Sequence, residues 1–168
     1  MNLADAFDKL IEREGSTLSL DASDPGNWTG GAVGAGRLVG SKYGVSAASY
    51  PNVDIANLSA AAAMGIYSTD YWNPIWGDQL PDSVAYEVFD EAVNSGVHGA
   101  IKVLQGALNV PTDGVMGPAT YAALMHADGR RLGILLNASR LDFYTTLAAW
   151  PSQGKGWARR VSANLRML

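Results

Sequence analysis

The sequence predicts a mainly α-helical fold with one small β-containing region near the N-terminus. Apolar residues recur at spacings of three and four in seven segments, the pattern of helices that bury one face. Residues 15–46 contain eight glycines, which favours loops and a small β-hairpin near residues 28–46. The 168 residues are 48% hydrophobic and 17% charged. This balance predicts a packed globule of one domain, or of one domain with a small appended part.

The first helix is expected over residues 2–13, with an apolar stripe that includes Phe7 and Leu10. One further step of four reaches Glu14, so its carboxyl group is expected to face the core side of the helix. Gly15 then ends the helix beside a loop. A half-buried carboxyl group in that position stays partly protonated near neutral pH, as a general acid must. A glutamate that simply frays at a helix end is the other interpretation.

The remaining helices are marked by caps, prolines and apolar spacing. Ser59 is the expected N-cap of a helix that ends before Pro74, Pro81 begins the next helix, and Gly96 ends it. Four more helices are expected around Ile101 to Leu108, after Gly117-Pro118, over Leu132 to Phe143, and from Lys155 onward. Short strands are expected at Val33, at Leu38-Val39 and at Tyr43 to Val45.

Several kinds of chemistry are excluded by residue types and spacing. There is no cysteine, which excludes disulfides and thiolate zinc sites. His98 and His126 lack the spacing of a zinc hydrolase, and no nucleophile elbow occurs. We therefore expect neither a metal nor a cofactor. The N-terminus lacks the features of a secretory signal, and no apolar run approaches the ~18–20 residues of a membrane span.

Charge is distributed unevenly along the chain, whose net charge is −4. Residues 1–100 hold 4 basic and 13 acidic side chains, whereas residues 101–168 hold 8 basic and 3 acidic ones. The last eighteen residues contain Lys155, Arg159, Arg160 and Arg166 and no acid. This pattern predicts contact with a polyanion, which is nucleic acid, a membrane surface or an acidic polymer of the cell envelope, or it marks only a solvated basic helix. Nucleic acid is not expected, because the N-terminal half is acidic and no recognition motif occurs.

Carboxyl chemistry is what these exclusions leave. Glycoside hydrolysis needs a protonated acid and a second group that handles water or the developing positive charge. Glu14 suits the first role, and Asp24 and Thr29 follow it across a glycine-containing loop. The segment Asp24-Pro25-Gly26 is equally typical of a turn in which the aspartate bonds its own backbone.

An ordered set of short motifs carries a resemblance to a known family over nearly the whole chain. They are Glu14-Gly15, Asp24 to Gly26, Tyr43 to Ser46, Tyr71-Trp72, Phe89 to Gly96, Leu104-Gln105, Asp113 to Thr120, Arg140, Phe143-Tyr144 and Gly156-Trp157. The first half resembles glycoside hydrolase family 108, muramidases with a Glu-Gly-Gly signature. The second half is similar to the peptidoglycan-binding region that accompanies this family.

The resemblance implies a lysozyme-like fold, with a muramidase part over residues 1–95 and a peptidoglycan-binding part over residues 96–168, packed into one globular unit. It implies hydrolysis of the β-1,4 bond between N-acetylmuramic acid and N-acetylglucosamine in peptidoglycan glycan strands, with Glu14 as the acid. Family members occur as endolysins of phages and as prophage lysis proteins. A small enzyme that acts on a mesh is expected to be monomeric. Since the N-terminus lacks a secretory signal, the protein is expected to be made in the host cytoplasm and to act in the periplasm and cell wall after holin-type release.

Two departures from the family pattern leave the water-positioning residue open. Ser16 replaces the second glycine of the signature, and residues 27–40 are inserted before the Tyr43 motif. The threonine of the family pattern therefore corresponds to Thr29 or to Ser41, and in phage-type lysozymes this residue manages the attacking water together with an aspartate, here Asp24.

Candidate saccharide contacts combine flat rings with an amide. They are Trp28, Tyr43, Tyr71 and Asn94. Tyr71 is alternatively a residue of the packed core. Asp90, within the motif Phe89 to Gly96, is equally well interpreted as a structural helix cap or as an ion-pair partner. The rival functions are a lytic transglycosylase on the same fold and a non-catalytic protein that binds the wall or assists secretion.

Overall fold

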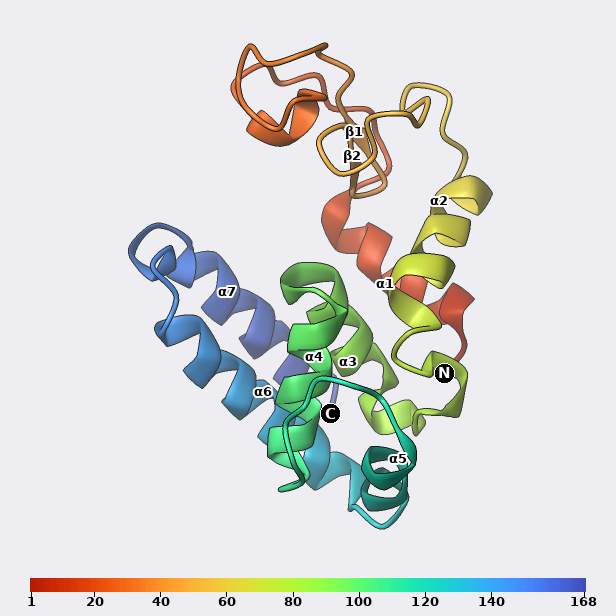
Figure 1. Cartoon of the computed structure of the whole chain (residues 1–168), viewed down its shortest axis with the longest axis vertical. Coiled ribbons are helices and arrows are strands. Elements are labelled where there is room, and N and C mark those ends of the chain that lie inside the picture. Colours follow the sequence, from red (N-terminus) through yellow and green to blue (C-terminus); the bar gives the residue numbers. More distant parts are fainter. The chain divides into compact units, whose positions relative to one another are not determined.

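The protein is mainly α-helical, as predicted (Figure 1). The computed structural model describes residues 1–168, with every side chain except that of Glu14. Its seven α-helices are α1 (Leu3–Glu14), α2 (Ala60–Tyr67), α3 (Asp82–Ser95), α4 (Val97–Ala107), α5 (Pro118–Met125), α6 (Gly129–Thr145) and α7 (Trp150–Leu165). The only sheet among the described residues is antiparallel, with strands β1 (Ser41–Lys42) and β2 (Val45–Ser46).

The chain divides into two compact units. One unit is Phe7–Ser68, and the other joins Met1–Ala6 to Thr69–Leu168. The predicted division into a muramidase part and a peptidoglycan-binding part concerns function, so it stays a prediction. No helix in the described part of the chain is long and apolar enough to cross a membrane.

The unit Phe7–Ser68 contains the glycine-rich region. Ser41 lies opposite Ser46 across the two strands, and the turn between the strands is Tyr43-Gly44. Both turn residues have positive φ, 54° and 72°, as in the two-residue turns that match the twist of a hairpin. The phenol of Tyr67 in α2 donates a hydrogen bond of 3.0 Å to the Tyr43 carbonyl. The hairpin is therefore tied to α2 at its turn.

The predicted strand positions are wrong in detail. Val33 lies in a loop and is 58% exposed, and Leu38 forms only an isolated bridge with Trp28. The segment Tyr43-Gly44 makes the turn, so the strands lie on either side of it. Glycines account for the difference, because four of the seven residues from Gly30 to Gly36 are glycine and leave no alternating pattern for a strand.

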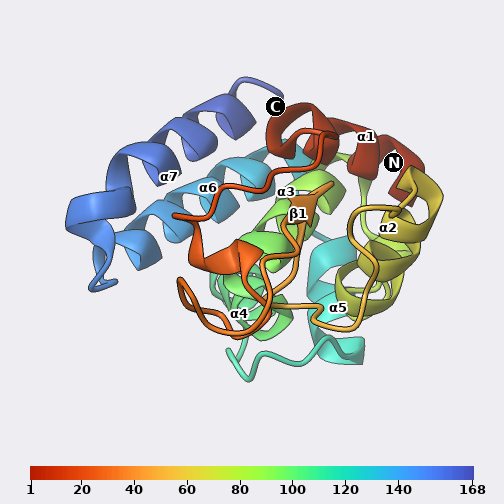
Figure 2. The same cartoon turned by 90° about the horizontal axis from the view of Figure 1, so that it is seen from above.

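The unit that contains Thr69–Leu168 is built around α3. Nine consecutive residues of this helix, Val84 to Ala92, are buried, which is the pattern of a helix covered on all sides. It packs against α4 and α6, and α6 and α7 lie side by side (Figures 1 and 2). The edge-to-face rings of Trp72 and Phe89, 5.4 Å apart, add to this core.

Helix boundaries follow the predicted caps, with two differences. The Ser59 hydroxyl accepts a hydrogen bond from the Ala62 N–H as N-cap of α2. The helix predicted to end before Pro74 is α2 followed by a π-helical turn, Ser68–Trp72. The last helix begins at Trp150, earlier than the predicted Lys155. Pro151 lies in its first turn, where the missing N–H costs no helical hydrogen bond.

Candidate active site

Glu14 is the last residue of α1, and its side chain lies outside the described part of the structure. The backbone N–H of Gly15 donates to the Ile11 carbonyl at 2.8 Å, and Gly15 has a φ of 81°. The helix therefore ends where the sequence predicted. The orientation of the Glu14 carboxyl group and its role as the acid stay predictions.

Asp24 forms the turn that its sequence context predicts. Its Oδ1 accepts a hydrogen bond of 2.8 Å from the Gly26 N–H and caps a short 3-10 helix, Pro25–Asn27. Buried Asn27 anchors this turn, because its side chain donates to the Asp21 carbonyl and its own carbonyl accepts from Gly40. The carboxyl group of Asp24 is exposed but oriented by the turn.

Trp28 and Thr29 hold the glycine-rich loop together. The indole N–H of Trp28 donates to the Ala22 carbonyl at 2.9 Å. The Thr29 hydroxyl accepts a hydrogen bond of 2.9 Å from the Arg37 N–H, and the two backbones are joined by a second hydrogen bond. The Thr29 hydroxyl therefore has a structural role in closing this loop.

Ser41 is fixed by its backbone on two sides. It exchanges hydrogen bonds with Ser19 at 2.8 and 3.0 Å and faces Ser46 across the hairpin. Next to it, the Lys42 amine lies 5.4 Å from the ring centre of Tyr43. Thr29, Ser41 and Tyr43 are all half-buried, so the structure leaves both hydroxyl groups as candidates for positioning water.

The other two predicted saccharide contacts lie in the unit with Thr69–Leu168. Tyr71 is half-buried in the π-helical turn, beside the fully buried Trp72. Asn94 is committed to an ion-pair network, because its amide donates to the Asp90 carbonyl at 2.6 Å and its oxygen accepts from Arg160. Asp90 forms ion pairs with Arg140 and Arg160. Of the two structural interpretations, a helix cap or an ion-pair partner, the second is therefore confirmed.

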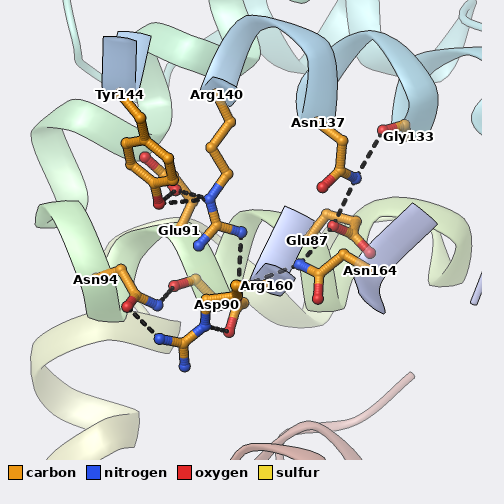
Figure 3. Close-up of polar contacts among 10 residues, drawn as sticks. All are labelled: Glu87, Asp90, Glu91, Asn94, Gly133, Asn137, Arg140, Tyr144, Arg160 and Asn164. Atoms are coloured by element: carbon orange, nitrogen blue, oxygen red, sulfur yellow. Dashed lines mark hydrogen bonds and ion pairs between the residues drawn. The ribbon is translucent and has the colours of Figure 1, made fainter. Parts of the chain in front are cut away.

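That network is the densest polar feature of the described residues (Figure 3). Arg140 contacts Asp90 Oδ2 at 2.6 Å through Nη1 and forms an ion pair with Glu91 through Nε. Arg160 contacts Asp90 Oδ1 at 3.1 Å. Glu87 lies beside them and accepts amide hydrogen bonds of 2.8 and 2.9 Å from Asn137 and Asn164. Two guanidinium groups thus face three carboxyl groups.

Burial and charge perturb these acids differently. Burial alone would raise the pKa of Asp90, but Arg140 and Arg160 hold it below its ordinary value. Burial raises the pKa of Glu87 against the opposing effects of the amide hydrogen bonds from Asn137 and Asn164 and of the charge on Arg140. Burial also raises the pKa of Glu91 against the opposing effects of Arg140 and Tyr144. Among the three acids, Asp90 and Glu91 form ion pairs with a guanidinium group, whereas Glu87 is held by amide hydrogen bonds.

Sequence reasoning did not find most of this network. Polar residues at positions 87, 90, 91 and 94 recur at spacings of three and four inside an apolar helix, and this signal marks one polar face. The envelope contact expected of Arg160 stays a prediction, although its side chain is only 19% exposed and pairs with Asp90. Lys155, Arg159 and Arg166 are exposed. Among the described side chains, no cluster of histidines and acids is arranged to hold a metal ion.

Comparison with known proteins places the chain among the glycoside hydrolases. The model of the family Glycosyl hydrolase 108 matches residues 7–96, more than half of the chain. The chain belongs to this family, which supports peptidoglycan hydrolysis in general. Residues 97–168 lie beyond the matched segment.

A solved structure resembles nearly the whole chain. The structure of Brucella abortus SagA is similar with a TM-score of 0.80 and 28% sequence identity, over 98% of this chain and 92% of that chain. No curated protein matches the sequence.

Proposed function

We propose that the protein is an N-acetylmuramidase that cleaves the β-1,4 bond between N-acetylmuramic acid and N-acetylglucosamine. The observation that carries this proposal is the family match over residues 7–96. That segment contains Glu14, Asp24, Thr29 and Ser41, which are all of the predicted catalytic residues.

Glu14 is proposed to donate a proton to the glycosidic oxygen as the bond breaks. It ends α1 immediately before the loop that carries the other candidates. At that end of a helix the backbone carbonyl groups carry partial negative charge. A partial negative charge disfavours the charged form of any carboxyl group close to it, which is the physical argument for an acid at the end of this helix.

Asp24 is proposed to position the attacking water, together with the hydroxyl of Thr29 or Ser41. Support for Asp24 comes from its turn, which leaves the carboxyl group exposed and oriented. The Thr29 hydroxyl accepts a hydrogen bond from Arg37, so its proton is available to a water molecule. Ser41 is held by two backbone hydrogen bonds to Ser19, which suits a fixed hydroxyl.

We further propose that residues 96–168 bind peptidoglycan and that exposed Lys155, Arg159 and Arg166 contact an anionic envelope polymer. The exposure of these three side chains supports that contact. The protein is proposed to act as a monomer in the periplasm, after release through a separate pore of the holin type.

Glu14→Gln tests the proposal. The variant should release soluble fragments from purified sacculi about 10²–10⁴-fold more slowly, the usual contribution of general acid catalysis. Glu12→Gln is the matched control, because Glu12 is exposed two residues earlier in the same helix, and it should keep normal activity. Near-normal release by Glu14→Gln would sink the assignment.

Mass spectrometry of the released fragments separates the rival functions. Hydrolysis leaves a reducing muramic acid at the fragment end, whereas a lytic transglycosylase leaves the 1,6-anhydro form. A protein that only binds the wall would release no fragments at all.

A further inference from the structure

A cavity lined by three aromatic side chains and no charged one lies within the unit that contains Thr69–Leu168. Its volume is about 230 Å³, and it lies between the C-terminal end of α3 and the hairpin of α6 and α7. Its lining residues are Asn94, Ser95, Phe143, Tyr144, Leu147 and Trp157. No lining side chain carries a formal charge, although the buried ion pairs lie one layer below.

The inner wall of the cavity is held rigidly. The rings of Tyr144 and Trp157 have centres 4.9 Å apart, and Trp157 lies 6.3 Å from Trp150. The Tyr144 hydroxyl donates to Glu91 at 2.8 Å and accepts from Arg140 at 2.6 Å. The buried network thus fixes the aromatic wall before any ligand arrives, which lowers the cost of binding.

The outer wall is an exposed aromatic ring. Phe143 is 39% exposed, and it also lines a second cavity of about 280 Å³ with residues of α4 that include Gly99 and Gly106. One ring therefore borders two adjacent hollows. This arrangement suits a chain-like ligand longer than a single sugar.

Two neutral polar groups complete the first cavity. The Asn94 amide is oriented by Asp90 and Arg160. The Ser95 hydroxyl is the second polar group in the lining, and a hydroxyl group can both donate and accept a hydrogen bond. A rigid apolar surface with a few fixed neutral polar groups is typical of a site for an uncharged, partly polar ligand.

We propose that this cavity binds an N-acetylglucosamine residue of the glycan strand. This inference rests on the proposed function. Ring faces pack against the C–H surface of a sugar and against the methyl group of its acetamide, while Asn94 and Ser95 pair with its amide and hydroxyl groups. The first cavity has no charged side chain in its lining, which favours the neutral sugar there over the anionic peptide stems of peptidoglycan, whereas Lys102 lines the second cavity. Phe143 and Trp157 are thereby assigned as substrate-binding residues beyond the family-matched segment.

Binding to purified sacculi tests the inference in the full-length Glu14→Gln chain, which is expected not to digest them. Adding Phe143→Ser should weaken co-sedimentation about three- to tenfold, the scale of one aromatic contact. Phe143→Tyr keeps a ring and should restore binding. Ile134→Ser is the matched control, because Ile134 is an apolar residue of α6, 47% exposed, that lines neither cavity, and it should bind normally.

A second measurement detects the binding of a soluble sugar to the cavity without sacculi. Soluble N-acetylglucosamine oligomers should change the tryptophan fluorescence of the wild-type chain, and Trp157→Phe should reduce that change. The same oligomers should displace the Glu14→Gln chain from sacculi. Equal melting temperatures of the parent and Phe143→Ser chains establish that folding is intact.

The inference is overturned if Phe143→Ser binds sacculi as tightly as its parent, or if stem peptides displace the chain and the sugar oligomers do not. Failure of the proposed function has a different outcome. In that case the wild-type chain releases no muramic acid ends, or Glu14→Gln still digests sacculi, while the fluorescence titration continues to report on the cavity.

Discussion

Two regions of the molecule are stabilised internally by different kinds of polar contact. They are the glycine-rich region, taken here as residues 15–58, and the helical bundle of α3, α4, α6 and α7. In residues 15–58 the side-chain contacts are mostly local and exposed, such as Asp24 with Gly26 and Asp54 with Asn57. In the bundle, the main contacts join residues 50 to 77 positions apart, such as Asp90 with Arg140 and Glu87 with Asn164. The first region depends on backbone geometry, and the second depends on compensation of buried charge.

This difference predicts different weak points. Each exposed ion pair or turn contributes little to the free energy of unfolding. The glycine-rich region should therefore be destabilised most where a new side chain obstructs its backbone. Buried charges are costly when one partner is removed, so the bundle should fail where its charges are unbalanced.

Arg140→Met should have the largest effect on folding. Arg140 is 2% exposed and contacts two buried carboxylates, and the carboxylates of Asp90 and Glu91 raise its pKa despite burial. Removing the guanidinium leaves Glu91 without its ion-pair partner and Asp90 with Arg160 alone, at a cost of about 3–5 kcal/mol in the free energy of unfolding. Denaturant titration measures the loss.

Two control variants sharpen this result. Arg140→Lys keeps the charge but loses the forked geometry, so it should be intermediate. Arg130→Met changes an exposed arginine of the same helix and should be within about 0.5 kcal/mol of the wild type. Equal stability of the Arg140→Met and Arg130→Met chains would show that the buried charges do not stabilise the bundle.

The same contrast explains what sequence could predict. Ser59 as a cap, Gly96 as a helix end and the Asp24 turn were readable because each signal lies within four residues. The family motifs pointed to the hydrolase class from short segments. The partners of Asp90 were not readable, because Arg140 and Arg160 reach it only after three helices have packed. The Glu14 carboxyl group stays a prediction for the same reason, since its surroundings depend on packing rather than on local spacing.

Gly40→Ala should have the next largest effect, in the glycine-rich region. Gly40 has a φ of 95°, and a Cβ there would overlap the Ser19 carbonyl oxygen and lie 2.8 Å from the Leu20 side chain. Backbone strain and displacement together should cost about 2–3 kcal/mol. The Ser41 N–H donates to that same Ser19 oxygen, so its hydrogen exchange should become faster.

Gly34→Ala separates the cost of backbone strain from the cost of displacing neighbouring atoms. Gly34 has a φ of 80°, but a Cβ there would meet no atom within 4 Å. It should therefore lose only about 1 kcal/mol through conformation, and Ser41 exchange should be unchanged. If both alanine variants gave the same loss, close approach to Ser19 would not matter.

Glu87→Gln should have the smallest effect on the free energy of unfolding, and it should increase that free energy at neutral pH. Burial raises the pKa of Glu87 above its ordinary value of 4.5, so the folded state binds the proton more tightly than the unfolded state. The stabilisation from the protonated form is complete below about pH 4.5 and is lost as pH rises through the folded pKa. Glutamine is neutral throughout, its oxygen can accept from Asn137 and Asn164, and its new N–H can donate to Asn137 Oδ1, which lacks a partner.

The variant should therefore match the wild type at pH 4 and be more stable at pH 7. Asp90→Asn is the informative contrast, because the arginines lower the pKa of Asp90. The stability that Asp90 contributes is present above its unfolded value of 3.8 and is lost as pH falls, so Asp90→Asn should be least stable relative to the wild type at neutral pH. Thermal melts of both variants between pH 3 and pH 7 measure the two slopes. Parallel slopes would mean that Asp90 and Glu87 respond to pH in the same direction, and that the contrast between an ion-paired Asp90 and an amide-bonded Glu87 is wrong.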